Sequence, residues 1–287
     1  MRGEQGKLES LVTSLQQYWW LVPLGFGAGI YGTLIGAGGG FVLAPLLLIL
    51  YPQDNPENIT SISLAVVFFN ALAGSFAYGR AKRIDYRSGL LFSAATIPGS
   101  MLGALSTAYL SRPRFNAILG LMMIGGSVFL LLPHKSNKKH DHDCATSNAT
   151  RLVIDAKGIR HVYAYNSKLA VTISAFVGYV SSLLGIGGGI IHVPVLVQLL
   201  NFPVHIATAT SHFVLAIMAF TGTAVHVATG AFTHGIRRTT TLAIGVILGA
   251  PLGARISQRV HGPWIIRGLA LALGFVGVRI LIQGFWA

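Results

Sequence analysis

The chain has 287 residues, of which 53% are hydrophobic and 10% are charged, and its 21 Lys and Arg exceed its 8 Asp and Glu to give a formal charge of +13 at pH 7. Soluble domains have about 25% charged residues, so this composition excludes a single water-soluble globule and indicates that lipid surrounds most of the chain. It also disfavours nucleic-acid binding, because most Lys and Arg lie in short loops at expected membrane boundaries.

Ten apolar segments follow one another along the chain and predict an all-α, polytopic transmembrane bundle of 8–10 segments. Most segments reach the roughly 20 residues that cross a bilayer, but the second and the seventh are too short and are expected to be half-helices or re-entrant pieces. The segments lie at 18–36, 40–51, 59–79, 88–110, 115–132, 168–185, 189–200, 206–228, 240–259 and 263–284.

The predicted organisation is an N-terminal tail (1–17), a first transmembrane repeat (18–132), a hydrophilic cytoplasmic linker (133–166) and a second transmembrane repeat (167–287). The first apolar segment continues into a glycine motif that the second half repeats, so we expect it to stay in the mature protein rather than be removed as a signal peptide. Cys144 is the single cysteine, so no intramolecular disulfide is expected.

A glycine-rich motif occurs once in each half. Residues 36–47 read GAGGGFVLAPLL and residues 185–196 read GIGGGIIHVPVL, an offset of 149 residues. Glycine costs about 1 kcal/mol relative to alanine inside a helix, so such a cluster predicts that the helix stops and restarts. The residues expected to break the helices are Gly36, Pro45, Gly185 and Pro194.

The restarted helices carry the predicted substrate site. A helix N-terminus has unpaired N–H groups and a partial positive charge, so two of them facing one cavity between the repeats would bind a small anion. The other interpretation is that the glycines only let helices cross closely. The candidate substrate-binding residues are Gly38, Gly39, Gly40, Ser63, Asn70, Gly187, Gly188, Gly189, His192, Ser211 and His212.

The acidic residues support an anionic substrate. All eight lie in expected tails or loops, whereas cation transporters usually keep a carboxylate within the membrane. Three histidines, His192, His212 and His226, fall within or near segments of the second half, at positions where the first half has Leu43, Leu64 and Tyr78. His192 and His212 could donate to an oxyanion or take up a proton, and each of the three could simply bond a neighbouring helix carbonyl.

Smaller features concern packing and topology. The small-residue steps at 98–104 and 248–254 predict close helix packing. The basic loop 80–87 and the basic linker are expected on the cytoplasmic side, and the loop with Asp54 and Glu57 on the other side. Eight spans in two parallel halves or ten in two inverted halves both fit the pattern. Counting Lys and Arg slightly favours eight, because that places Arg237 and Arg238 inside.

No metal site, cofactor or enzymatic site is assigned. The linker run His140, Asp141, His142, Asp143 and Cys144 could bind a metal, but a hydrophilic run of this kind is more often simply solvated. Ser211 and His212 are adjacent, yet neighbours on a helix point about 100° apart and no carboxylate is available to orient the histidine, which argues against an enzyme. The nucleotide-binding pattern Gly-x-x-x-x-Gly-Lys-Ser/Thr does not occur.

The paired Gly-x-Gly-Gly-Gly stretches, each with a proline five residues on, the Thr/Ser-rich helix starts and the step from Asn70 to Gly74 resemble the sulfite exporter TauE/SafE family of membrane permeases. The likeness covers about residues 20–132 and 168–284, although the second half has Met218 where Asn70 stands. The resemblance implies transport, mostly outward, of small sulfur-containing anions such as sulfite, sulfoacetate or related organosulfonates across the bacterial inner membrane.

We therefore predict a multi-pass protein of the bacterial inner membrane that acts as a secondary transporter, with the lipid bilayer and a small anionic substrate as its partners. Coupling to protons or to the membrane potential fits equally well, and a homodimer is compatible with the sequence. Two alternatives stay open: a divalent metal-ion transporter that uses the membrane histidines, and an anion channel.

Overall fold

The computed structural model describes residues 18–131, 149–232, 235–257, 259–260 and 262–285. These residues form ten helices and one two-stranded sheet, and the molecule is 77% helical, which confirms the predicted helical bundle. The first five helices are α2 (Leu21–Ile35), α3 (Gly40–Leu50), α4 (Pro56–Arg80), α5 (Tyr86–Thr107) and α6 (Arg112–Leu131). The later five are α7 (Ser167–Leu184), α8 (Gly189–Gln198), α9 (Val204–Ala228), α10 (Ile236–Ser257) and α11 (Gly262–Phe285).

Each helix lies within a few residues of a predicted apolar segment. Five helices, α4, α5, α7, α9 and α10, are long and apolar enough to cross a membrane. The helices α3 and α8 have 11 and 10 residues, so at about 1.5 Å per residue each reaches only about halfway across a bilayer. The chain is therefore a multi-pass membrane protein in which two of the apolar segments are half-helices, as predicted.

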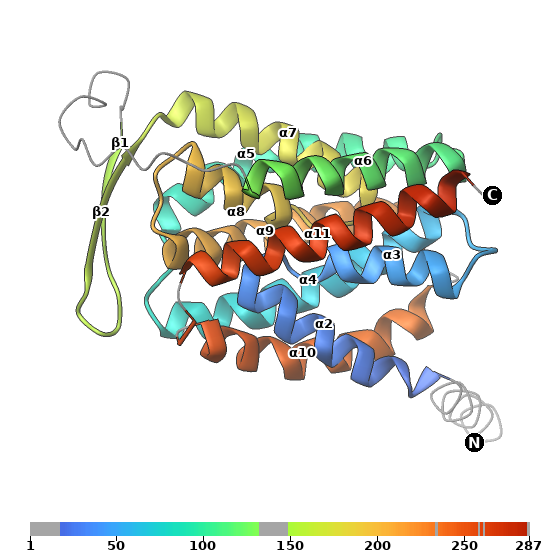
Figure 1. The fold of residues 1–287 in the computed structure, drawn as a ribbon, viewed down its shortest axis with the longest axis horizontal. Helices are drawn as coiled ribbons and strands as arrows, with labels where there is room; N and C mark the ends of the chain where they lie inside the picture. Colours follow the sequence, from blue (N-terminus) through green and yellow to red (C-terminus); the bar gives the residue numbers. More distant parts are fainter. Residues whose placement is uncertain (1–17, 132–148, 233–234, 258, 261, 286–287) are drawn as a thin grey trace.

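The helix pair α2 and α3 enters and leaves on one face of the molecule. Arg112, at the start of α6, donates to the carbonyl oxygens of Leu48 and Asp54 at 2.7 Å, which places the end of α3 beside the α5–α6 loop. The ring of Tyr18, just before α2, lies 6.0 Å from the Arg238 guanidinium, and Arg238 pairs with Asp54. Figure 1 shows the start of α2 and the end of α3 at the same end of the bundle.

The pair α7 and α8 enters and leaves on the opposite face. Asn166 caps the start of α7 by accepting hydrogen bonds from the N–H groups of Lys168 and Leu169. After α8 ends, the ring of Phe202 packs 4.3 Å from the ring of Tyr163, which precedes α7. We call this side, with residues 81–85, 149–165 and 199–203, the linker face, and the side with residues 51–55, 108–111 and 229–232 the opposite face.

The second five helices therefore run in directions opposite to the first five, as in the inverted alternative, although α3 and α8 are too short to complete the ten crossings of that alternative. The slight preference for eight parallel spans was wrong, because Arg238 lies on the opposite face with Asp54 rather than on the linker face. The guanidinium of Arg238 also stacks 3.6 Å from the centre of the Tyr51 ring. The Asp54 carboxylate neutralises the Arg238 charge locally, which a count of Lys and Arg does not include.

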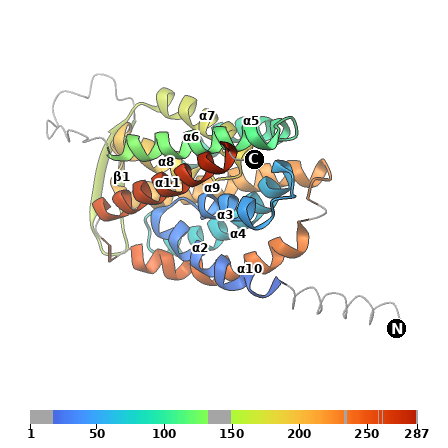
Figure 2. The same ribbon diagram turned by 45° about the vertical axis from the view of Figure 1, so that its right-hand side comes forward.

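Helices pair across the two halves in a matching pattern. Helix α2 packs on α10 and α7 packs on α5, while α4 packs on α9 and α6 packs on α11 (Figures 1 and 2). The central pair α4 and α9 encloses an apolar core that includes Leu64, Val67, Leu215 and Met218. The duplication itself stays a prediction from the sequence.

The predicted small-residue steps do allow close packing. A methyl group at Gly99 or Gly103 of α5 would overlap the carbonyl oxygens of Ala175 or Tyr179 in α7. The corresponding step in α10 behaves in the same way, since Gly249 and the neighbouring glycines of that helix lie against the backbone of α2. Backbone contact of this kind lets helices associate in lipid, where the hydrophobic effect supplies no driving force between them.

Part of the hydrophilic linker is folded. Strands β1 (Ala149–Ile154) and β2 (Arg160–Tyr165) form an antiparallel hairpin in which Arg151 stands opposite Tyr163. The sequence contains a signal for it, since β-branched and aromatic residues such as Val153, Val162 and Tyr163 lie on both sides of a short turn that includes Gly158, where φ is +78°. The hairpin stands at the linker end of the bundle (Figure 1).

Candidate substrate site

The glycine motifs break the chain as predicted. In the first break Gly36, Gly38 and Gly39 have φ values of +83°, +74° and +78°, and in the second break Gly185 and Gly187 have +66° and +73°. Residues with a side chain rarely adopt this left-handed region, so glycine is required for the sharp turns between α2 and α3 and between α7 and α8. Pro45 and Pro194 then lie inside α3 and α8.

The two breaks cross each other at the centre of the molecule. A methyl group at Gly189, the first residue of α8, would overlap the carbonyl oxygen of Gly36, and one at Gly40, the first residue of α3, would lie 2.6 Å from the carbonyl oxygen of Ile186. The N-termini of the half-helices thus approach the opposing loop. For Gly40 and Gly189, close crossing is by itself a sufficient reason for glycine.

Serine hydroxyls from the central helices hold the breaks. Ser63 of α4 donates to the carbonyl oxygen of Gly185 at 2.5 Å, and Ser211 of α9 donates to that of Gly36 at 3.4 Å. Each serine therefore binds the break that belongs to the other half of the chain. A carbonyl left unpaired by a helix break is costly inside a bilayer, so these bonds stabilise the broken conformation.

A narrow gap lies beside the N-terminus of α8, and in this conformation it has no room for a water molecule; we call it the closed space. It brings together four of the predicted residues, Gly188, Gly189, His192 and Ser211, and its wall also contains Thr96 of α5, which the sequence reasoning missed. His192 is buried, and its Nε2 lies 3.2 Å from the Ser174 hydroxyl. The Nδ1 atom of His192 has no hydrogen-bond partner among the described residues.

A second polar cluster lies between α2, α4 and α9. The hydroxyl of Thr33 donates to Oδ1 of Asn70 at 3.1 Å and lies 3.3 Å from Nε2 of His212. Tyr78 donates to the carbonyl oxygen of Thr33 at 2.7 Å and packs edge-on against the His212 ring. The amide nitrogen of Asn70 has no partner among the described residues. Thr33 and Tyr78 were missed because nothing in their spacing distinguishes them from ordinary helix residues.

Some residues of the second polar cluster have apolar residues at the matching positions of the other half of the chain. Asn70 and His212 meet in one place, whereas their counterparts Met218 and Leu64 belong to the apolar core between α4 and α9. The Asn70 amide and the His212 imidazole thus belong to one cluster, while near Met218 and Leu64 the polar side chains are the hydroxyls of Ser100 and Ser182. His226 is buried, and neither ring nitrogen has a partner among the described residues.

The predicted residues thus divide into three groups. Gly188, Gly189, His192 and Ser211 border the closed space. Asn70 and His212 form the second cluster with Thr33. The remaining glycines lie in close contact with other parts of the protein, because a methyl group at each would meet a neighbouring atom at 3.1 Å or less. These glycines are Gly38, Gly39, Gly40 and Gly187. Ser63 is engaged by the second break.

The described carboxylates stay at the ends of the bundle. Asp54 and Glu57 lie on the opposite face, and Asp85 and Asp155 lie on the linker face. Within the described part of the chain no three His, Cys, Asp or Glu side chains come close enough to hold a metal ion. The linker residues 140–144, for which metal binding was considered, lie outside the described residues.

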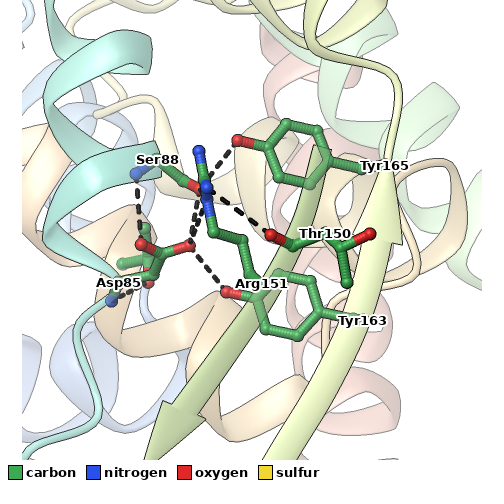
Figure 3. A network of polar contacts seen from close by, with 7 residues as sticks. Asp85, Ser88, Thr150, Arg151, Tyr163 and Tyr165 are labelled. Atoms are coloured by element: carbon green, nitrogen blue, oxygen red, sulfur yellow. Dashed lines mark hydrogen bonds and ion pairs between the residues drawn. The ribbon is translucent and has the colours of Figure 1, made fainter. Parts of the chain in front are cut away.

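The hairpin is attached to the linker face by a buried polar network (Figure 3). The carboxylate of Asp85, before α5, accepts hydrogen bonds from the Tyr163 phenol at 2.7 Å and from the Ser88 hydroxyl at 2.5 Å, and lies 3.8 Å from Arg151. Burial and the neighbouring Asp85 charge raise the pKa of Tyr163, so it stays a protonated donor. The hydroxyl of Tyr165 lies 2.7 Å from that of Ser88.

This network places the hairpin over the His192 region. The ring of Phe92 in α5 packs 5.7 Å from the rings of both Tyr165 and His192, edge-on in each case. Phe202 joins the same apolar cluster. The hairpin therefore covers the linker-face end of the helices that surround the closed space.

The fold and the site define a class: a multi-pass helical membrane protein with two oppositely oriented re-entrant helix pairs that meet at its centre beside neutral polar side chains. The model of the sulfite exporter TauE/SafE family matches residues 21–280. The chain belongs to this family and is a membrane transporter.

Several curated proteins are similar over most of their length. The probable membrane transporter protein YunE of Bacillus subtilis is 32% identical over 276 residues, which cover 93% of this chain and 98% of that protein. A probable membrane transporter protein of Methanocaldococcus jannaschii is 24% identical, with 91% of this chain and 94% of that protein covered. No solved structure matches the chain.

Proposed function

We propose that this transporter is a secondary carrier, acting as an exporter, of small sulfur-containing anions such as sulfite, sulfoacetate or related organosulfonates, and that it resides in the bacterial inner membrane. The observation that carries the proposal is the half-helix α8, whose N-terminus borders a closed space lined by His192, Ser211 and Thr96. All of these groups are neutral donors or can become donors, as an oxyanion requires.

Charge supports the same sign of substrate. The described carboxylates lie at the two faces, away from the breaks, so they supply no counter-charge for a desolvated cation. The partial positive charge of an α-helix N-terminus acts most strongly in a low dielectric, which the buried position of α8 provides. The family name points to the sulfur oxyanions within this class.

The closed space is too small to hold a substrate anion in this conformation. Binding and transport therefore require the helices around it to separate. Because the breaks are held by hydrogen bonds from Ser63 and Ser211 to the opposing loop, a change at one break is transmitted to the other half. We infer that substrate replaces the weaker of these contacts, the 3.4 Å bond from Ser211 to Gly36, as it enters.

The test is flux of radiolabelled sulfite into liposomes that contain the purified protein, with sulfoacetate, thiosulfate, sulfate and chloride as competitors and with imposed pH and voltage gradients. Saturable sulfite flux that sulfoacetate inhibits supports the proposal. Absence of flux for every sulfur oxyanion overturns it, and conductance without saturation or coupling assigns the anion-channel alternative instead.

Two variants connect the flux to the site. Gly188 has φ −62°, and a methyl group there would meet the flexible side chain of Met218 at 3.0 Å, so Gly188→Ala keeps the fold and narrows the space. Ser211→Ala removes a hydroxyl from its wall. We expect Ser211→Ala to reduce sulfite flux about tenfold, the effect of one lost charge-assisted hydrogen bond, and Gly188→Ala to reduce it because the added methyl group occupies the space. Ser106→Ala is the control, because that exposed hydroxyl bonds only its own helix.

A further inference from the structure

We propose a second anion site on the linker face, separate from the glycine breaks. It is a pocket of about 310 Å³ between the end of α4, the tip of the hairpin and the last turns of α10, and it would bind an oxyanion group of the phosphate, sulfate or sulfonate type. The proposal does not depend on which ion is transported.

The pocket is built from three distant parts of the chain. Arg80 and Arg83 come from the end of α4 and the following turn, Lys157 from the hairpin tip, and Arg255 from α10. The N–H of Ala156 donates to the carbonyl oxygen of Ala81 at 3.0 Å, which fixes the hairpin tip against that turn. Four cationic side chains thus surround one volume that is large enough for a small ligand.

Arg83 is the buried anchor of the pocket. The turn after α4 includes Lys82 at φ +53°, and the chain then places the Arg83 side chain inward, with only 6% of it exposed. Its Nη1 atom has no hydrogen-bond partner among the described residues. A guanidinium presents several donors in a fixed fork that matches an oxyanion, and a buried donor without a partner is unfavourable, so a ligand at this position satisfies an existing deficit.

The four cationic side chains of the pocket exceed its single carboxylate, Asp155, whose charge interacts with that of Arg83. Among the described residues, none of the four cationic side chains forms an ion pair with a carboxylate. Asp155 also lines the pocket, but its Oδ1 accepts from the N–H groups of Lys157 and Ile159 at 2.9 and 3.0 Å, and its Oδ2 lies 3.7 Å from His161. The carboxylate is therefore occupied by the hairpin, and the pocket keeps a net positive charge.

The ligand has one chemistry and two sources. A free oxyanion in solution and the phosphate of an anionic lipid present the same charged oxygens, and the ends of α4 and α10 lie at an expected membrane boundary where lipid headgroups occur. Arg80 and Arg255 are exposed and can reach either source, while Arg83 lies deeper.

The experiment measures binding in two arms with the full chain. In the first arm inorganic sulfate is titrated by calorimetry into protein held in an uncharged detergent. In the second arm the protein is reconstituted in phosphatidylcholine nanodiscs with or without phosphatidylglycerol, and retained lipid is counted by native mass spectrometry. Sulfate binding in the first arm identifies a free oxyanion as the source, and selective retention of phosphatidylglycerol identifies a lipid.

Variants decide whether the binding belongs to this pocket. Arg83→Gln and Arg255→Gln are each expected to weaken binding about tenfold, the effect of one lost charge-assisted hydrogen bond. If Arg83→Gln does not fold, Arg255→Gln still tests the pocket, because that side chain is exposed. The control Lys168→Gln removes an exposed cation outside the pocket. Equal loss in the control and the pocket variants, or binding in neither arm, overturns the proposal.

Discussion

At the scale of single residues, the glycines of the two breaks differ in what they do. Gly189 lies against the backbone of the opposing loop, whereas Gly188 faces flexible side chains and borders the closed space. Neighbouring positions of the motif therefore differ: Gly189 is required for close packing, and Gly188 borders the proposed substrate site. Single substitutions at Gly188 and Gly189 are therefore needed to distinguish an effect on substrate binding from an effect on packing.

We expect Gly189→Ala to lower the free energy of unfolding by about 1–3 kcal/mol, because the added methyl group overlaps the carbonyl oxygen of Gly36, which cannot move without shifting the first break. The matched control is Gly125→Ala in α6, where a methyl group meets nothing within 4 Å. Thermal unfolding in detergent, followed by size-exclusion chromatography, compares the two. Equal stability of both variants would show that the breaks do not cross as described.

Asp155 gives a prediction about pH. Burial raises its pKa, but the N–H groups of Lys157 and Ile159 and the charge of Arg83 lower it more, so the net pKa lies below the ordinary value. A carboxyl whose folded pKa is lowered stabilises the fold above its unfolded pKa of about 4, and this contribution is lost as the pH falls through the folded value.

Asp155→Asn is accordingly expected to open the hairpin more often at pH 7, with backbone amides of residues 149–165 exchanging hydrogen roughly tenfold faster, since hydrogen bonds to a charged group contribute about 1.5–3 kcal/mol. The difference from the unsubstituted protein should shrink below about pH 4. Hydrogen exchange monitored by mass spectrometry measures both conditions. Identical exchange at pH 7 would contradict the assignment of this carboxylate to the hairpin turn.

At the scale of elements, the half-helix α3 ends without continuing across the bilayer, so its last carbonyl groups need partners. Arg112 supplies them by donating to the carbonyl oxygens of Leu48, Pro52 and Asp54. One side chain from α6 therefore terminates the re-entrant pair and connects it to the second layer of helices.

Arg112→Gln should lower stability by about 1.5–3 kcal/mol, because it leaves the half-buried carbonyl groups of Leu48 and Asp54 without their charged donor. Arg114→Gln, two residues further along α6, removes an exposed arginine and should change stability by less than about 0.5 kcal/mol. Thermal unfolding midpoints of the two variants in the same detergent make the comparison. A larger effect at Arg114 would refute the capping role of Arg112.

At the scale of the whole molecule, the two halves run in opposite directions through the membrane. The hairpin and the end of α9 must therefore lie on different sides, which the parallel, eight-span arrangement does not allow. With Cys144 replaced by serine, we expect a membrane-impermeant maleimide to label Lys157→Cys and Ala228→Cys from opposite sides; both positions are exposed. Labelling from the same side would favour the parallel arrangement.

The sequence by itself determined the class of protein and most of its elements. Low charge and ten apolar runs fixed a helical membrane bundle, and the positions of the helix breaks followed from glycine clusters whose effect on a helix is local. The close packing at Gly99 and Gly249 could likewise be predicted, because small residues at regular spacing on one helix let the backbone of another helix approach it. The hairpin signal was present in the β-branched and aromatic residues around Val153 and Tyr163 but was overlooked in a polar linker.

Only the tertiary structure decided the direction of the second half and the membership of the polar clusters. The side on which Arg238 lies depends on its pairing with Asp54, 184 residues away, and local charge counting does not contain that contact. The contact among Thr33, Asn70 and His212 likewise depends on the packing of α2, α4 and α9, which are far apart in the sequence. Local propensity specifies where helices begin and end, whereas a shared site depends on long-range packing that no short stretch of sequence encodes.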